Sequence, residues 1–343
     1  LTAAINSYQQ AIKLKPNYPD AHNNLGTALK DKGDLNAAIN SYQHALKLKP
    51  TYIKAHYNLG SALQERGDLN AAINSYQQAL KLKHDFPEAH NNLGISLKEQ
   101  GDLTAAMKSL QQALKLKPNY PEAHVNIANV FQEKGDLNTA INSYQQALKL
   151  QPDYPEAHWN LSLVELLSGN YKAGWEHHEW RWDIKEAKKP HAQPPIPEWK
   201  GEKLATGDKL LVVSEQGLGD TIQFMRYIPY LKQQGVDVSF CAQTKLHDLI
   251  KISSIHPNPL TTEQAQLVTE GKWIPLLSLP RYLNISPSNP IITEAYLSTT
   301  SALINKWNNL LSQEKKPVIG INWQGNPDAE KNNLKGRSLP LEA

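Results

Sequence analysis

Glycine recurs every 34 residues through the first half of the chain, at Gly33, Gly67, Gly101, Gly135 and Gly169. Alanine keeps the same spacing, at Ala21, Ala55, Ala89, Ala123 and Ala157. A fixed period of this length is typical of repeat architectures, in which each period is one small supersecondary unit. One such unit cannot bury its own apolar face, so successive units must stack and share a continuous core. The period therefore predicts a solenoid over residues 1–182.

Each unit is expected to hold two helices whose apolar stripes face each other. In the first unit these stripes are Ala21, Leu25 and Leu29 on one helix and Ala38, Tyr42 and Ala45 on the other. Gly33 ends the first helix, and Pro50 stops the second. Small Gly26 and Ala38 allow the two helices to approach closely.

This pattern resembles the tetratricopeptide repeat, in which two antiparallel helices occupy 34 residues. Within each unit, small residues, an aromatic residue, glycine and proline all lie at the positions where that family has them. Units are expected at about 19–52, 53–86, 87–120 and 121–154, with a divergent fifth unit at 155–182. Leu1 aligns with Leu35, so we expect the sequence to begin in the second helix of an earlier unit.

A row of asparagines shares the period, at Asn24, Asn58, Asn92, Asn126 and Asn160. In tetratricopeptide superhelices the first helix of each unit lines the concave face. An amide offers both donor and acceptor, so it can pair with both polar groups of a peptide backbone. The row resembles the asparagine ladder of the eukaryotic O-GlcNAc transferase superhelix, which holds substrate polypeptide. We predict a polypeptide in this groove; the alternative is that the amides bond within the scaffold.

Five histidines also share the period, at His22, His56, His90, His124 and His158. Neighbouring helix layers lie roughly 8–10 Å apart, whereas a zinc–nitrogen bond is about 2 Å long. We therefore expect these histidines to serve helix packing, and we predict no metal site.

The composition changes after Trp182. Residues 183–207, rich in proline and charge, are expected to form an extended connector. The apolar run K-L-L-V-V-S at 209–214 predicts a buried parallel strand, and the turn E-Q-G-L-G-D at 215–220 leads into a helix that Pro229 disturbs. Further candidates are a strand at 236–242, a helix at 246–252, a strand at 273–277, a helix at 293–312 and a strand at 317–323. This order predicts an α/β domain.

An ordered set of motifs in this region resembles a known family. The motifs are G-W-E-H-H-E-W-R-W, P-E-W-K-G-E-K-L, E-Q-G-L-G-D-T-I-Q-F-M-R-Y, P-L-L-S-L-P, G-I-N-W-Q-G-N-P and R-S-L-P-L. They are similar to bacterial tetratricopeptide proteins whose C-terminal region is related to the heptosyltransferases, with the GT-B architecture. The resemblance implies two Rossmann-like halves, the acceptor half at 208–314 and the start of the donor half at 315–343.

The resemblance also implies roles for individual residues. Asp220 matches the proposed catalytic base, and Glu215, Gln216, Gly217 and Gly219 form the acceptor loop around it. The two glycines let the backbone approach a ligand. The alternative is that Asp220 caps its helix. The donor diphosphate is expected to meet Gln324, Gly325, Asn326, Arg337 and Ser338.

Composition excludes several classes of protein. The chain has 36 Lys and Arg against 33 Asp and Glu, and a net charge of +3 gives no general case for a nucleic-acid partner. Cys241 is the single cysteine, so no disulfide framework is expected. The sequence contains no run of 18 apolar residues, so no membrane-spanning helix is expected. We expect a cytoplasmic location.

The sequence thus predicts a polypeptide-binding superhelix fused to a glycosyltransferase-like domain. The whole protein is expected to transfer a hexosyl or heptosyl group from a nucleotide-sugar donor, as substrate, to a polypeptide or other acceptor, with no cofactor. Because Ala343 follows soon after the first strand of the donor half, the sequence as given is expected to be inactive. The alternative is a non-catalytic scaffold for protein–protein interaction.

Overall fold

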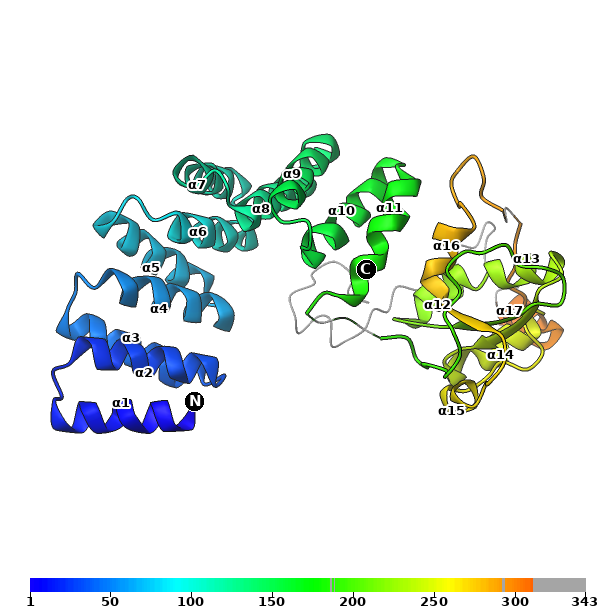
Figure 1. The fold of residues 1–343 in the computed structure, drawn as a ribbon, viewed down its shortest axis with the longest axis horizontal. Helices are drawn as coiled ribbons and strands as arrows, with labels where there is room; N and C mark the ends of the chain where they lie inside the picture. Colours follow the sequence, from blue (N-terminus) through cyan, green and yellow to red (C-terminus); the bar gives the residue numbers. More distant parts are fainter. Residues whose placement is uncertain (186, 188, 292–293, 311–343) are drawn as a thin grey trace.

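The computed structural model describes residues 1–185, 187, 189–291 and 294–310. Its first half is a row of antiparallel helices along a curved path (Figure 1). The helices are α1 (Thr2–Leu14), α2 (Pro19–Asp31), α3 (Leu35–Leu48), α4 (Ile53–Arg66), α5 (Leu69–Leu82), α6 (Pro87–Gln100), α7 (Leu103–Leu116), α8 (Pro121–Glu133), α9 (Leu137–Leu150), α10 (Pro155–Ser168) and α11 (Tyr171–His178). A 3₁₀ turn, η1 (Glu179–Trp182), ends the row.

Local sequence explains where these helices begin and end. Proline occupies the first turn of α2, α6, α8 and α10, where its missing N–H leaves no bond unmade. Asp34, Asp102 and Asp136 accept backbone N–H groups at the starts of α3, α7 and α9. Gly67 and Gly101 close α4 and α6 at φ values of 90° and 94°, in the left-handed region that glycine tolerates best.

The two helices of a unit meet where the sequence predicts. Tyr42 is 1% exposed against Gly26, and a methyl group added at Gly26 would lie 2.7 Å from the Tyr42 ring. The pair Gly60 and Tyr76 repeats this contact at the same distance. The small residue is therefore what allows the aromatic side chain to fill the space between the two helices.

The curvature places the first helices of the units on the inner side of the row. Successive first helices (α2, α4, α6, α8 and α10) pack against one another more closely than the second helices do. In a curved stack the inner elements are the closer ones. The asparagine row therefore belongs to the concave side.

The second half contains a parallel sheet of three strands in the order β2-β1-β3. The strands are β1 (Lys209–Val213), β2 (Asp237–Cys241) and β3 (Lys272–Pro275). Leu211 pairs with Ser239 on one side and with Trp273 on the other. Around them lie α12 (Leu218–Phe224), α13 (Tyr227–Gln233), η2 (Thr244–Leu246), α14 (His247–Ile252), α15 (Thr262–Gln266), η3 (Leu276–Ser278), α16 (Leu279–Tyr282) and α17 (Ser301–Leu310).

The three strands confirm the parallel sheet expected from the sequence. The sheet is small, and the described residues do not make it a clear Rossmann-like domain. The helix after the turn is divided into α12 and α13, and Pro229 lies in the first turn of α13. Residues 315–343, expected to open the donor half, lie outside the described residues.

Alternate residues of β1 face two separate cores, as the period of a strand requires. Leu210 and Val212 pack on the side that holds α13 and α14, whereas Leu211 and Val213 pack against Ala192 and Ile196. Ala192 and Ile196 belong to the connector. The connector also bonds to β3, because the Trp199 N–H donates to the Trp273 carbonyl at 2.7 Å. The connector therefore covers one face of the sheet as well as joining the two regions. No helix among the described residues is long and apolar enough to cross a membrane.

Candidate functional site

The asparagine row bonds from one repeat to the next. Asn58 Nδ2 donates to Asn23 Oδ1 at 3.0 Å, and Asn126 Nδ2 donates to Asn91 Oδ1 at 2.9 Å. In both pairs the acceptor lies 35 residues earlier and is buried. These amides therefore link the first helices of adjacent units.

The hydrogen-bond partner of each amide depends on the residue that lies 35 positions earlier in the sequence. Asn92 Nδ2 donates to the hydroxyl of Tyr57 at 3.0 Å. Asn160 would face Val125, which has no polar side-chain atom, and it instead donates to Asn129 Oδ1 at 3.4 Å. In the first unit Asn24 Oδ1 accepts from Asn23 Nδ2 at 3.2 Å.

The scaffold uses only part of the bonding capacity of these amides. Each amide has two N–H donors and a carbonyl acceptor, and the bond to the preceding unit takes one donor. Among the described residues, none donates a hydrogen bond to the side-chain carbonyl of Asn58, Asn126 or Asn160. These three side chains are half-buried. The row therefore combines inter-repeat bonding with acceptor atoms that remain available on the concave side.

The histidine row bonds to the turns between units. Each ring Nε2 lies 2.8–3.2 Å from the backbone carbonyl six residues earlier. That carbonyl belongs to Pro16, Pro50, His84, Pro118 or Pro152, just after a second helix has ended. Such carbonyls lack a partner within the helix, so the ring satisfies them. In the part of the chain that the structure describes, His, Cys, Asp and Glu side chains form no cluster of three or more suited to a metal ion.

A buried ion pair joins the solenoid to the sheet. Arg181, in η1, is 3% exposed, and Glu215, two residues beyond the end of β1, is fully buried. Arg181 Nε donates to Glu215 Oε2 at 2.9 Å, and Nη2 donates to Oε1 at 3.1 Å. The Leu277 N–H also donates to Glu215 Oε1 at 2.9 Å, and Arg181 reaches Ser278 Oγ at 2.8 Å and Glu179 Oε1 at 2.7 Å. Both charges are thus fully engaged.

The ion pair occupies the edge of the sheet where α/β proteins commonly bind ligands. Glu215 follows β1 and Ser278 follows β3, so both lie at carboxyl ends of strands where the chain order reverses. The Arg181 side chain fills this position between them. Burial raises the pKa of Glu215 while Arg181 opposes that shift. The sequence predicts Glu215 in a ligand loop and does not identify Arg181 as its partner. The signal that could have indicated Arg181 is the set of charged residues in the run W-E-H-H-E-W-R-W.

Asp220 makes the capping bond that was its alternative interpretation. One carboxylate oxygen, Oδ2, accepts the Gly217 N–H at 3.0 Å at the start of α12. The side chain is half-buried, and Gly219 beside it is exposed. The same geometry leaves Oδ1 without a donor among the described residues.

A pocket of about 500 Å³ lies beside this turn, at the carboxyl ends of β1 and β2. Gln216 and Gly217 line it, with Gln243 and Lys245 from the region after β2. Gln216 has a φ of 58°, a left-handed conformation that is unusual for a residue other than glycine. Gln216 and Gly217 therefore line a cavity, whereas Glu215, Gly219 and Asp220 are not among its lining residues. The expected donor residues 324–326, 337 and 338 lie outside the described residues.

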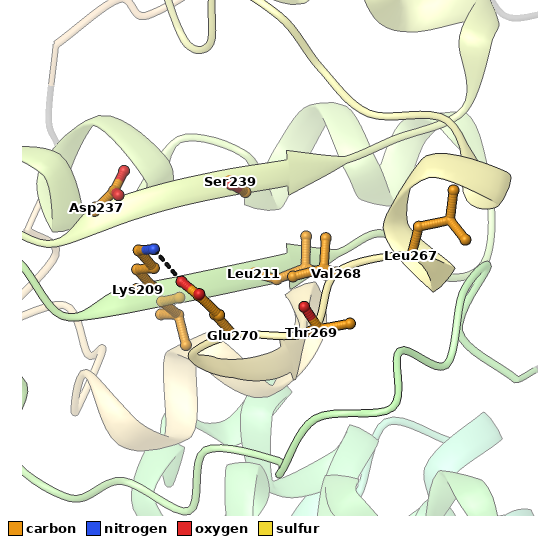
Figure 2. A pocket seen from close by; sticks show the side chains of 9 residues that line it. Lys209, Leu211, Asp237, Ser239, Leu267, Val268, Thr269 and Glu270 are labelled. Atoms are coloured by element: carbon orange, nitrogen blue, oxygen red, sulfur yellow. Dashed lines mark hydrogen bonds and ion pairs between the residues drawn. The ribbon is translucent and has the colours of Figure 1, made fainter.

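A second pocket, of about 380 Å³, lies at the opposite, amino end of the strands (Figure 2). Lys209 and Glu270 form an ion pair across it, and Asp237 begins the neighbouring strand. Both charges of the pair are largely exposed. Ligand sites of parallel sheets form at the carboxyl ends, so this pocket is the weaker candidate of the two.

Comparison with known proteins identifies the helical half. The TPR repeat family model matches residues 1–33, 28–66, 60–101, 96–135 and 128–167. No curated protein sequence matches the chain.

Several solved structures resemble the chain over the same region. YrrB, described as a TPR protein with an unusual peptide-binding site, is 21% identical, with 52% of this chain and 92% of that chain covered and a TM-score of 0.42. TTC0263, a thermophilic TPR protein from Thermus thermophilus, is 23% identical, with coverages of 49% and 92% and a TM-score of 0.43. MamA from Desulfovibrio magneticus RS-1 is 19% identical, with coverages of 47% and 91% and a TM-score of 0.43.

Proposed function

We propose that this chain, whose residues 1–167 are a tetratricopeptide-repeat solenoid, is a scaffold that holds an extended polypeptide in its concave groove. The observation that carries the proposal is the row of half-buried amides whose carbonyl oxygens accept no bond within the described scaffold, at Asn58, Asn126 and Asn160. These oxygens suit the N–H groups of a peptide backbone.

The spacing of the row fits an extended chain. Packed helix layers lie roughly 8–10 Å apart, and an extended chain advances about 3.3 Å per residue. One amide per layer therefore meets about every third residue of a bound chain. Contacts of this kind engage the backbone and accept many side-chain sequences, which suits a scaffold with varied partners.

The test compares two pairs of substitutions. Asn58→Ala with Asn126→Ala removes two acceptors and two inter-repeat bonds. Asn23→Ala with Asn91→Ala removes the same inter-repeat bonds and keeps the acceptors. Binding to an array of unstructured peptides is expected to weaken about tenfold or more in the first pair only, because both pairs lose the same inter-repeat bonds but only the first loses the acceptors. The second pair also loses the bonds that Asn23 and Asn91 donate to Asn24 and Asn92, so it is the more severe test of the scaffold. Equal binding by both pairs, or no peptide bound by the wild-type chain, would contradict the proposal.

A second candidate function is sugar transfer by the α/β region, and the pocket at the carboxyl ends of β1 and β2 favours it. In this candidate Asp220 Oδ1 takes the proton of an acceptor hydroxyl while Oδ2 keeps its bond to Gly217. The acceptor oxygen then forms the new bond to the anomeric carbon of a nucleotide sugar, whose diphosphate leaves. Gln324, Gly325, Asn326, Arg337 and Ser338 are the proposed diphosphate ligands.

Asp220→Asn separates this chemistry from the helix cap. The amide oxygen of asparagine can still accept the Gly217 N–H, but asparagine cannot take a proton. The whole protein is incubated with radiolabelled nucleotide sugars, and we expect transfer in the wild type and its loss in Asp220→Asn. Equal transfer by the two proteins removes Asp220 from the role of base, and no transfer by the wild type removes the candidate.

A further inference from the structure

A pocket of about 600 Å³ lies where the end of the solenoid, the connector and strand β3 meet. Its lining combines aromatic rings from three segments, Trp182, Trp273 and Tyr282, with the cations Lys189 and Arg281. The volume is in the range of small-molecule sites, and such sites often lie between structural units.

The aromatic walls are held in place by neighbouring groups. The ring centroids of Trp199 and Tyr282 lie 5.2 Å apart, and Trp199 is buried. The guanidinium of Arg181 lies 4.2 Å from the Trp182 ring, and Arg181 is itself fixed by Glu215. A ring entering this pocket therefore meets aromatic surfaces that are already ordered, which reduces the entropy lost on binding.

The charges of the pocket are unequally compensated. Glu179 accepts hydrogen bonds from Arg181 and Ser278, and Glu198 is paired with Lys200. Within the described ranges, neither Lys189 nor Arg281 has a carboxylate within 4.0 Å. The guanidinium of Arg281 lies 5.2 Å from the ring of Tyr282, beside the aromatic wall. Among the described lining residues, three cations (Lys189, Lys200 and Arg281) therefore face two carboxylates (Glu179 and Glu198), so positive charge is in excess next to the aromatic rings.

We propose that this pocket binds a ligand that carries an aromatic ring and an anionic group on the same small unit. The ring packs on Trp182, Trp273 and Tyr282. The carboxylate or phosphate pairs with Arg281, whose planar guanidinium suits two-point bonding, and with Lys189. Two sources supply this chemistry: a free aromatic acid or phosphate, and the C-terminal residue of a polypeptide that ends in an aromatic side chain. The site lies outside the groove of the repeats, so it does not depend on the function proposed for them.

The test uses calorimetric titration of the whole chain with defined probes. The charged probes are N-acetyl-phenylalanine, phenyl phosphate and a short peptide that ends in Phe with a free carboxylate. The neutral counterparts are N-acetyl-phenylalanine amide and the same peptide with an amidated end. Arg281→Gln and Lys189→Gln are the pocket variants, and Lys251→Gln, which removes an exposed lysine of α14, is the matched control.

We expect the charged probes to bind and the neutral ones to bind about tenfold more weakly or worse. Arg281→Gln and Lys189→Gln are each expected to reduce this preference for charge, and Lys251→Gln to keep it. Equal affinity for the free acid and the peptide indicates a small-molecule ligand, whereas much tighter binding of the peptide indicates a polypeptide end. The proposal is overturned when no charged probe binds, or when Arg281→Gln binds as the wild type does.

Discussion

Arg181 Nε lies 2.9 Å from Glu215 Oε2, and this contact spans 34 residues of sequence to join the last turn of the solenoid to the end of the first strand. Both side chains are buried, and Ser278 and the Leu277 N–H complete their hydrogen bonds. A buried guanidinium that bonds to both regions restricts how the helical row and the sheet can move against each other. The orientation of the two regions is therefore part of the folded state.

Removing one member of this pair leaves the other charge buried and unpaired. We expect Arg181→Met and Glu215→Gln each to lower the free energy of unfolding, by about 3–5 kcal/mol for the loss of a charge partner. The double variant Arg181→Met with Glu215→Gln is expected to be more stable than the sum of the single effects implies, because no lone charge remains. Urea unfolding of the four proteins measures the coupling, and strict additivity would contradict the buried pair.

His178 makes the stability of the junction depend on pH. Its pKa is lowered to about 3, first by burial and second by Arg181, which also donates to its Nδ1 at 3.2 Å. The folded state therefore binds fewer protons than the unfolded chain, whose histidines titrate near pH 6.5. The stability is complete above about pH 6.5 and falls as the pH drops toward 3.

At pH 5 we expect this histidine to reduce the free energy of unfolding by about 2 kcal/mol relative to neutral pH. His178→Gln has no proton to gain, so its stability should fall less between pH 7 and pH 5. The comparison of the two unfolding curves isolates His178 from the other titrating groups. Parallel curves would show that His178 does not titrate as its burial requires.

Gly60 is required by the side chain opposite it. A methyl group at this position would lie 2.7 Å from the Tyr76 ring, which is fully buried. Gly60→Ala is expected to lower the free energy of unfolding by about 1–3 kcal/mol through overpacking, despite the better helix propensity of alanine. Gly219→Ala is the control, because no atom lies within 4 Å of its added methyl group. Thermal melts that shift equally for both variants would contradict this explanation.

His56 holds the turn that precedes its helix. Its Nε2 lies 2.8 Å from the Pro50 carbonyl, and the same bond recurs in every unit from His22 to His158. We expect His56→Ala to lower the free energy of unfolding by about 0.5–1.5 kcal/mol, the usual value of one hydrogen bond. Asn40→Ala, which changes an exposed residue of α3, should leave stability nearly unchanged. Denaturant midpoints of the two variants provide the comparison.

Much of the fold follows from local patterns. The helices of the repeats are predictable because their signals are local. Prolines begin helices and glycines end them within a few residues of the boundary, and the 34-residue period repeats these signals along the chain. The run K-L-L-V-V-S likewise predicts β1, and the turn after it predicts the start of α12. Asparagines at one repeat spacing indicate which amides share the concave side.

Contacts between distant residues were decided by tertiary structure alone. No periodicity indicates that Arg181 lies at the edge of the sheet where β1 and β3 end, or that Ala192 and Ile196 of the connector cover the far side of β1. The partner of each asparagine also depends on the residue in the unit before it, which is Asn23 for Asn58 and Tyr57 for Asn92. A repeating sequence determines its helices because those bonds are local. The pairing of buried charges and amides depends on which surfaces packing brings together, and that is a property of the whole chain.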